Sequence, residues 1–225
     1  MTDGRPVATP PRASRPSSAR RVAAATAPRI GTVSGMARFT PPAADAMRAT
    51  LLAAARDEFS AHGIAGARVE RLAATAGSNK AQVFHYFGGK DGLFDALLTH
   101  ELTAALDAAP LDTADLPEWA GRLHDVTVER PWVQRLATWH RLERPDVALE
   151  TLVERHGEAV AEVERAQRAG VLPRRFRPAV LFGLVVHLAV FWTALAPEAA
   201  GSVAAVTPPR RRQVVVDAVG ALLGD

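Results

Sequence analysis

Apolar residues recur along most of the chain at helical spacing, and the strict alternation typical of β-strands is absent. The clearest short run is Val69, Leu72, Ala73 and Ala76, which follow one another at i, i+3, i+4 and i+7. This spacing predicts a short helix packed on one side. Gly77 ends the run, because glycine readily adopts the left-handed backbone that turns a chain out of a helix.

A second short helix is predicted directly after this turn. Asn79 is a favourable N-cap, and Gln82 can reach back to the backbone N–H of the cap, as in a capping box. Along residues 79–87, Val83 and Phe87 fall on one side, which we expect to be buried. Two short helices joined by a tight glycine turn form a helix-turn-helix.

The other side of the second helix carries residue types that suit the major groove of DNA. A cation and an amide can bond base edges, and apolar atoms can meet thymine methyl groups. The residues on this side are Lys80, Ala81, Gln82, Phe84 and His85. Any surface helix can carry such residues, so the pattern alone leaves ordinary packing open as an alternative to DNA binding.

The same periodicity predicts helices in the rest of the chain. Met47, Leu51, Ala55 and Phe59 lie four residues apart, and Gly63 follows them. The expected helices cover residues 44–62, 69–76, 79–87, 90–109, 116–129, 131–143, 146–168, 179–196 and 209–223. With neither repeats nor a glycine-rich phosphate loop, the sequence predicts an all-α fold.

Residues 46–98 resemble the DNA-binding domain of the tetracycline-repressor (TetR) family. That family has a helix ending in phenylalanine and glycine, then Val-x-x-Ile-Ala-x-x-Ala-Gly, Ser-Lys-Gly-x-Leu-Tyr-x-Tyr-Phe and Lys-Glu-x-Leu. This chain has Phe59 and Gly63, VERLAATAG at 69–77, NKAQVFHYF at 79–87 and KDGLF at 90–94.

Four positions depart from the family pattern. Phe84 replaces the usual tyrosine and so lacks a hydroxyl, and Glu70 stands where arginine is frequent. Ser78 replaces an apolar turn residue, and Ala67 replaces a capping threonine or serine. These changes leave the fold intact but alter the expected contacts with bases and phosphates.

The resemblance implies a domain organisation and a function. Residues 44–92 would form a three-helix helix-turn-helix DNA-binding domain, and residues 93–225 a helical effector-binding and dimerisation domain, after a tail at 1–43. The protein would be a ligand-responsive transcriptional regulator, most simply a repressor, that binds a palindromic operator in double-stranded DNA as a homodimer. The implied DNA-binding residues are Asn79 at the cap, Lys80 and Gln82 at base edges, Ala81 and Phe84 at methyl groups or sugars, and His85, Tyr86 and Lys90 at phosphates.

Two apolar helices are predicted near the C-terminus, at 179–196 and 209–223. The first is long enough for a minimal membrane span, although His187 sits in its middle. It can instead be buried in a helical core or a subunit interface. The resemblance favours the second interpretation, because the last two long helices of family members form a four-helix dimer interface. We therefore expect a homodimer through both ranges and no membrane partner, with a membrane-associated helical protein as the alternative.

Aromatic and imidazole side chains are concentrated in the helical half, where family members enclose a small ligand. Such groups often line cavities for partly apolar molecules. The candidates for binding an effector of unknown identity are Trp119, Trp139, His140, Phe182, His187 and Trp192. Ordinary core packing is an alternative for each of them. A small-molecule-binding helical protein with a vestigial helix-turn-helix also remains possible at this point.

Charge is distributed unevenly along the chain. Residues 1–44 contain seven arginines and one aspartate, residues 45–99 six charges of each sign, and residues 100–225 fourteen basic and seventeen acidic groups. The basic excess thus lies in the tail, whose composition predicts disorder to about Thr40. The tail is interpreted as a solvated extension, a basic arm for DNA phosphates, or a targeting segment, and Met36 could be the true start.

The sequence contains little that indicates an enzyme. It has no cysteine, which excludes disulfides and thiolate metal sites and suits a cytoplasmic location. Its seven histidines form no H-x-x-x-H or H-E-x-x-H pattern, and no G-x-S-x-G turn is present. We therefore expect no catalytic residue, no metal and no cofactor.

Overall fold

The computed structural model describes residues 41–224, which form ten α-helices, one short 3₁₀ helix and no strand. This confirms the predicted all-α class. The tail at 1–40, with its proposed roles and the alternative start at Met36, lies outside the described residues. The helices are α1 (Pro41–Gly66), α2 (Val69–Thr75), α3 (Lys80–Phe87), α4 (Lys90–Ala108), α5 (Leu116–Glu129), α6 (Pro131–Glu143), α7 (Glu150–Arg168), α8 (Pro178–Val190), α9 (Pro197–Ala200), η1 (Gly201–Val203) and α10 (Pro208–Leu223).

Most predicted helix boundaries are correct to within a few residues, and the largest error is at α8. The sequence predicts one apolar helix to residue 196, but α8 ends at Val190. There the hydroxyl of Thr193 donates to the Val190 carbonyl at 2.9 Å, and the indole of Trp192 donates to the Arg211 carbonyl at 3.0 Å. The helix thus ends in a hydrogen-bonded turn, and α9 and η1, which the sequence did not predict, follow.

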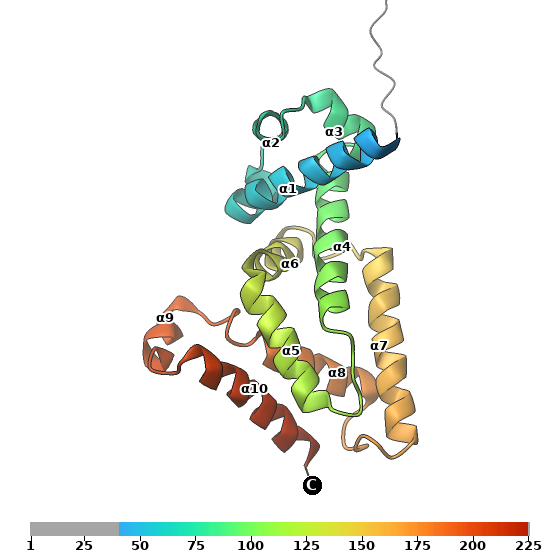
Figure 1. Ribbon diagram of the computed structural model, residues 1–225, viewed down its shortest axis with the longest axis vertical. Coiled ribbons are helices and arrows are strands. Elements are labelled where there is room, and N and C mark those ends of the chain that lie inside the picture. The colour runs from blue at the N-terminus through green and yellow to red at the C-terminus, as the bar shows by residue number, and fades with distance from the viewer. Residues whose placement is uncertain (1–40, 225) are drawn as a thin grey trace, which may run out of the picture. The chain divides into compact units, whose positions relative to one another are not determined.

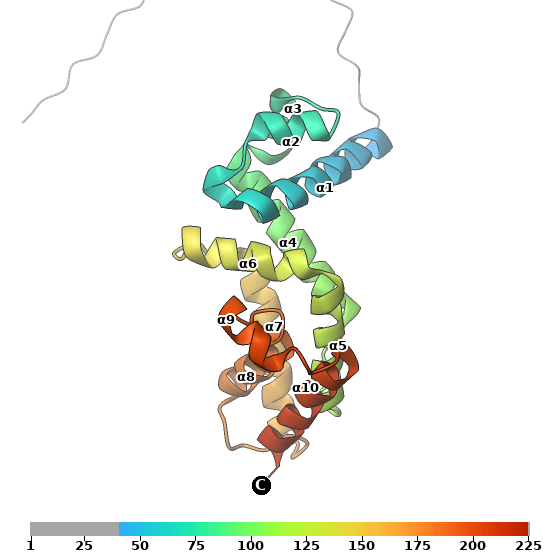
Figure 2. The ribbon, with the colours of Figure 1, turned by 90° about the vertical axis from the view of Figure 1, so that its left-hand side faces the viewer.

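Helix α4 connects two groups of helices. Figure 1 shows α1, α2 and α3 around its N-terminal end, and α5, α7, α8 and α10 nearer its other end, with α6 between the groups. Figure 2, seen from the side, shows the same arrangement. Each group has its own cluster of buried apolar side chains, and the half-buried Leu102 and Trp132 pack against both clusters. The two groups are therefore continuous rather than joined by a flexible linker.

The last helix is held against α5 by close packing and charge. A Cβ atom added at Gly121 would lie 2.9 Å from Val216, so the two helices approach closely at this point. Beside it, the guanidinium of Arg212 donates to Asp125 at 2.8 Å and also pairs with Glu118. The hydrogen bond from Arg212 lowers the pKa of Glu118 because it stabilises the charged form of that carboxyl group.

A buried carboxylate joins α1 to the start of α2. Glu58 is 8% exposed and accepts hydrogen bonds from the backbone N–H of Arg68 at 2.8 Å and from Nε of Arg71 at 2.7 Å. The hydrogen bond from Arg71 lowers the pKa of Glu58 and outweighs burial, which raises it. The helix-turn-helix is thus fixed to its supporting helix by a charge-assisted contact.

Substituting Glu58→Gln is expected to lower the free energy of unfolding by about 1.5–3 kcal/mol, because the bonds to Arg71 lose their ionic component. Urea unfolding measures this change, with Asp57→Asn on the exposed side of α1 as control. Because the pKa of Glu58 is lowered on folding, its contribution is present above the unfolded value of about 4.5 and is lost as pH falls through the folded value. An equal loss in both variants contradicts this account.

Candidate nucleic-acid interface

The turn between α2 and α3 has the predicted geometry. Gly77 has a φ of 60°, and the N–H of Ser78 donates to the Ala73 carbonyl at 2.8 Å, which closes the end of α2. Asn79 caps α3, because its side chain accepts from the N–H of Gln82 at 3.1 Å. The second half of the expected capping box differs, since the oxygen of the Gln82 side chain accepts from the hydroxyl of Ser78 at 2.7 Å instead.

Helix α3 packs on one side and exposes the other. Val83 is fully buried, as predicted, and Phe87 is half-buried beneath the guanidinium of Arg48, 4.6 Å from its ring centroid. The residues expected at the opposite face, Lys80, Ala81, Phe84 and His85, are all exposed, whereas Gln82 and Tyr86 are half-buried. Phe84 is 50% exposed, which is unusual for a large apolar side chain.

Several of these exposed side chains already have partners within the protein. Lys80 donates to Glu70 of α2 at 2.9 Å, and its ammonium lies 5.9 Å from the ring centroid of Phe84. The ring of His85 meets that of Tyr86 edge to face, with centroids 5.1 Å apart. Contacts within the protein thus fix the positions of the Lys80 ammonium and of the aromatic rings without DNA.

Lys90, at the N-terminus of α4, contacts the end of α1. Its ammonium donates to the carbonyls of Ala65 at 3.3 Å and Ala67 at 3.4 Å. These bonds satisfy carbonyls that the end of α1 leaves open. Lys90 therefore joins α1 to α4, a role that the sequence did not predict.

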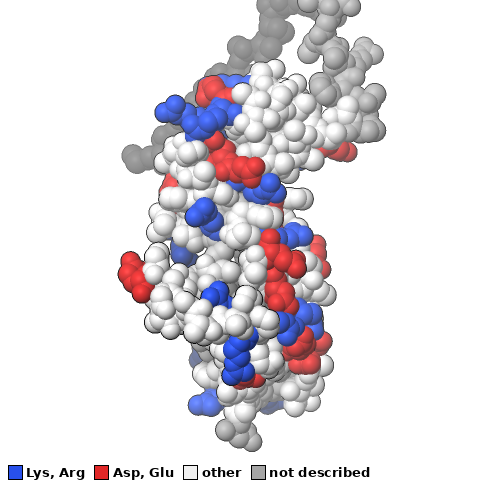
Figure 3. Space-filling view, turned by 60° about the vertical axis from the view of Figure 1, so that its left-hand side comes forward, with Lys and Arg blue, Asp and Glu red and all other residues white. Residues whose placement is uncertain are grey.

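The face drawn in Figure 3 shows basic and acidic side chains beside one another on several elements, without a single basic patch. This agrees with the balance of six basic and six acidic residues at 45–99. On this face and in residues 45–99, attraction to phosphates would come from individual side chains and not from a large net positive charge.

A contact that sequence reasoning missed joins the end of α6 to a break in α1. Gly63 has a φ of 69° and interrupts the helix, as predicted, which leaves the next backbone N–H groups without helical acceptors. The carboxylate of Glu143 accepts from Ile64 at 3.1 Å and from Ala65 at 2.6 Å. Any Cβ atom at Gly63 would collide with Glu143 and lie only 3.0 Å from the ring of Trp139.

The next residue along the chain extends this contact to α4. Arg144 forms a two-bond ion pair with Asp95, and the pair is only partly exposed. The C-terminal end of α6 is thus bonded to both α1 and α4, the helices that carry α2 and α3. No sequence signal could have found these bonds, because the partners lie far apart along the chain.

The six residues proposed for an effector do not form one site. Trp119 and Phe182 stack with centroids 6.0 Å apart and line a cleft of about 550 Å³ beside α4 and α7. Trp139 lies against Gly63, and His140 stacks on Phe94, where burial and the nearby Arg144 lower the pKa of its imidazole.

The last two of the six proposed effector residues, His187 and Trp192, lie in two further places. Trp192 bonds the carbonyl of Arg211. His187 lines a different cleft, of about 580 Å³, between α4, α5, α6 and α8. We call this second space the apolar cleft, because most of its lining is aliphatic or aromatic: Leu102, Ala105, Leu106, Leu123, Thr127, Val133, Gln134, Ala137, Arg141, Val186, His187, Val190, Phe191, Ala194, Leu195 and Ala196.

Comparison with known proteins gives matches over both groups of helices. Residues 51–97 match the family described as bacterial regulatory proteins, tetR family, and residues 115–220 match the tetracyclin repressor-like C-terminal domain. The HTH-type transcriptional repressor SCO4008 of Streptomyces coelicolor is 33% identical over 157 residues, which are 68% of this chain and 81% of that protein. The chain belongs to the TetR family.

Other relatives agree with this membership. The repressor NicS of Pseudomonas putida is 40% identical over 83 residues, 35% of this chain and 38% of its own length. The crystal structure of SCO4942 from Streptomyces coelicolor has a TM-score of 0.70 at 38% identity and covers 78% of this chain and 97% of its own. Salmonella enterica GusR shares the fold, with a TM-score of 0.61 at 20% identity, over 82% of this chain and 98% of its own.

As a TetR-family member, the chain is a DNA-binding transcriptional regulator and not an enzyme, as the sequence predicts. TetR-family regulators bind operator DNA, dimerise and carry a C-terminal ligand-binding domain. The alternative of a vestigial helix-turn-helix is not favoured. Within residues 41–224, no helix is both long and apolar enough to cross a bilayer, and no group of three or more His, Asp or Glu side chains could hold a metal ion.

The substitution Glu143→Gln is expected to lower the free energy of unfolding by about 1–3 kcal/mol, because it replaces one of two acceptors with an amide N–H that faces a backbone donor. Hydrogen exchange at the amides of Ile64 and Ala65 should become faster. The matched control is Glu154→Gln on the exposed side of α7. Unchanged protection at both amides would show that they do not depend on this carboxylate.

Proposed function

We propose that this TetR-family regulator is a ligand-responsive repressor that binds a palindromic operator as a homodimer, with α3 of each subunit in a major groove. The observation that carries this proposal is the exposed face of α3, which is fixed by a capped start, a glycine turn at its end and a buried Val83. A rigid helix with one exposed polar and aromatic face suits groove recognition. Its DNA partner would place the protein in the cytoplasm.

Gln82 is the side chain best placed to distinguish bases. Its oxygen is engaged by the hydroxyl of Ser78, so its amide N–H groups remain to donate. Major-groove acceptors for such a donor are N7 and O6 of guanine, N7 of adenine and O4 of thymine. Lys80 would also meet a base edge, but it must first exchange Glu70 for that partner.

The other proposed contacts are to methyl groups, sugars and phosphates. Ala81 and the exposed ring of Phe84 would meet thymine methyl groups or sugars. His85 and Tyr86 would contact phosphates, with Asn79 at the start of the helix. Lys90 uses two of its three ammonium donors within the protein, which leaves one for a phosphate.

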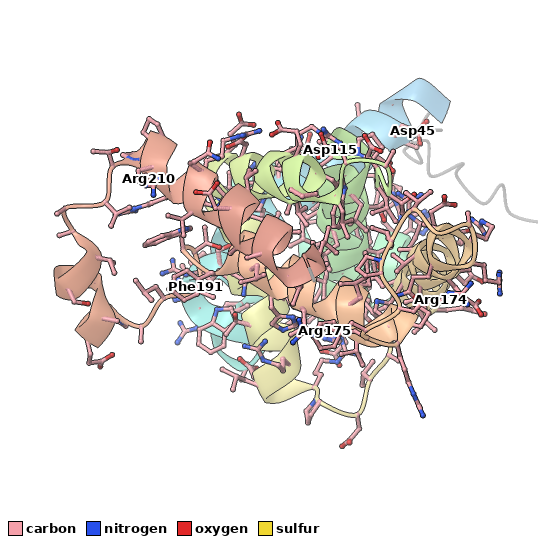
Figure 4. The ribbon with its side chains drawn as sticks, turned by 90° about the horizontal axis from the view of Figure 1, so that it is seen from below. Asp45, Asp115, Arg174, Arg175, Phe191 and Arg210 are labelled. Carbon is pink, nitrogen blue, oxygen red and sulfur yellow. The ribbon has the colours of Figure 1, made fainter. Side chains whose placement is uncertain are left out.

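A surface for the second subunit is proposed on α8 and α10, within the predicted ranges 179–196 and 209–223. Val180, Leu184 and Phe191 follow one face of α8 and its end, and they are 48%, 39% and 45% exposed. Figure 4 shows Phe191 where the chain leaves α8 toward α9. Helix α10 packs beside α8 and adds the exposed Ala221. Exposed apolar side chains on two adjacent helices favour an interaction site here.

Two-fold symmetry connects this surface with the operator. An interface formed by the same helices of both subunits is isologous and places two copies of α3 in related positions. The bound sequence should then be a palindrome with half-sites about one helical turn, or a multiple of it, apart. An effector that binds better to a different spacing of the two helices would release the DNA.

Selection of bound sequences from a random duplex pool should enrich such a palindrome. Gln82→Ala is expected to relax preference at one or two positions, by about 1–3 kcal/mol of discrimination at each. Lys90→Gln should instead weaken all sequences alike and reduce the slope of log affinity against log salt by about 1. The melting temperature of each variant checks the fold. Equal effects of both variants on sequence preference contradict the assigned roles, and an unselective dimer contradicts the proposal.

Leu184→Glu is expected to convert the dimer to a folded monomer, because a charge in an apolar interface stays without a partner. Sedimentation gives the mass in solution, and circular dichroism gives the helix content. Val153→Glu is the matched control, since Val153 is an exposed aliphatic residue on α7 outside the proposed surface. Dissociation by both variants, or by neither, places the interface elsewhere.

A further inference from the structure

A second space adjoins the apolar cleft on a neighbouring face of α6. This polar cleft has a volume of about 630 Å³ and is lined by Ser60, Pro131, Trp132, Gln134, Arg135, Thr138, Arg141, Thr193, Ala194 and Leu195. Gln134, Arg141, Ala194 and Leu195 line both clefts. The two clefts therefore meet at these four residues, and a ligand that occupies one lies next to the other.

The lining of one cleft is mostly polar and that of the other mostly apolar, but the only charged side chains in either lining are basic. Together the two linings contain two guanidinium groups, Arg135 and Arg141, and no aspartate or glutamate. Within residues 41–224, neither arginine takes part in an ion pair, whereas Arg144 and Arg155 both pair with carboxylates of α4. Arg135 and Arg141 are both exposed; Arg135 lines the polar cleft and Arg141 lines both clefts. Guanidinium groups beside a cleft without an acidic neighbour favour an anionic ligand group.

Ser60, which also lines the polar cleft, is a second group that could bind a polar part of a ligand. The hydroxyl of Ser60 is buried and has no hydrogen-bond partner among the described residues. Buried hydroxyls are normally bonded, so an unpaired one at the wall of a cleft is available to a ligand oxygen. Ser60 belongs to α1, while Arg135 and Arg141 belong to α6.

The other end of the space has the opposite character. Its walls include Leu106 of α4, Leu123 of α5, and Val186 and Val190 of α8, and its volume suits a compact organic molecule. Burial of an apolar body in this cleft would supply most of the binding free energy. The arginines would then select for charge at the polar end.

We propose that the effector is an amphipathic anion, with an apolar body in the apolar cleft and a carboxylate-type head between Arg135 and Arg141. This inference rests on the proposed ligand-responsive function and names the chemical class of the ligand. The head would bridge α6 to Ser60 of α1, next to the contact between Glu143 and the turn at Gly63. A ligand bound there would therefore act on the contact between α6 and α1, which holds the DNA-binding helices in place.

Calorimetric titration of the full-length protein with decanoate, decanol and decylammonium tests this class. We expect decanoate to bind about tenfold or more tightly than decanol, as one charge-assisted contact allows, and decylammonium to bind most weakly. Arg141→Gln should weaken decanoate about tenfold or more and leave decanol unchanged. Arg175→Gln, outside both clefts and exposed, is the control and should change neither.

Three results would overturn the inference: equal affinity for decanoate and decanol, preference for decylammonium, or unchanged decanoate binding in Arg141→Gln. Circular dichroism and the decanol titration show whether that variant is folded. Operator release is measured separately by adding each compound to the complex with DNA. Decanoate binding that depends on Arg141 but does not release DNA supports the site and contradicts ligand-responsive repression. Release by a compound whose binding ignores Arg141 supports repression and contradicts the anionic class.

Discussion

The backbone donors of a broken helix have to find acceptors, and in this protein they find them on another helix. Gly63 interrupts α1 and leaves the N–H groups of Ile64 and Ala65 open, and Glu143 accepts both. A buried donor without an acceptor costs about 1–3 kcal/mol, and Ile64 is 5% exposed, so the turn and the end of α6 stabilise each other. Because α2 and α3 follow this turn in the chain, their position depends on where α6 ends.

Helix α4 supplies the second connection between the two groups of helices. Its first turn holds the end of α1 through Lys90, and Asp95 holds Arg144 at the end of α6. Farther along, Leu102 packs against both hydrophobic clusters. A displacement of α6 therefore acts on α1 and α4 together, which makes independent movement of the DNA-binding helices costly.

Local features of the fold could be predicted from the sequence, and long-range ones could not. Gly77 and Asn79 determine the backbone within a few residues, so the helix-turn-helix was correctly predicted. The exposed face of α3 was predicted correctly except at Gln82, which is half-buried. Glu143 meets the amide of Ala65 across 78 positions, and no spacing rule connects them. Aromatic residues were grouped by their place in the chain, but Trp139 faces Gly63 instead of the clefts, because helix rotation is set by packing.

The ion pair between Lys80 and Glu70 bears on how such a protein searches a genome. Before Lys80 can meet DNA it must leave Glu70, so it exchanges one anionic or polar partner for another and gains less than an unpaired lysine would. Residues 45–225 also carry a net charge of −3, so affinity for arbitrary DNA receives little general attraction from this part of the chain. Weaker attraction to unrelated sequences would shorten each unproductive encounter. Preference for the operator would then depend on low affinity for unrelated DNA as much as on the contacts with the operator itself.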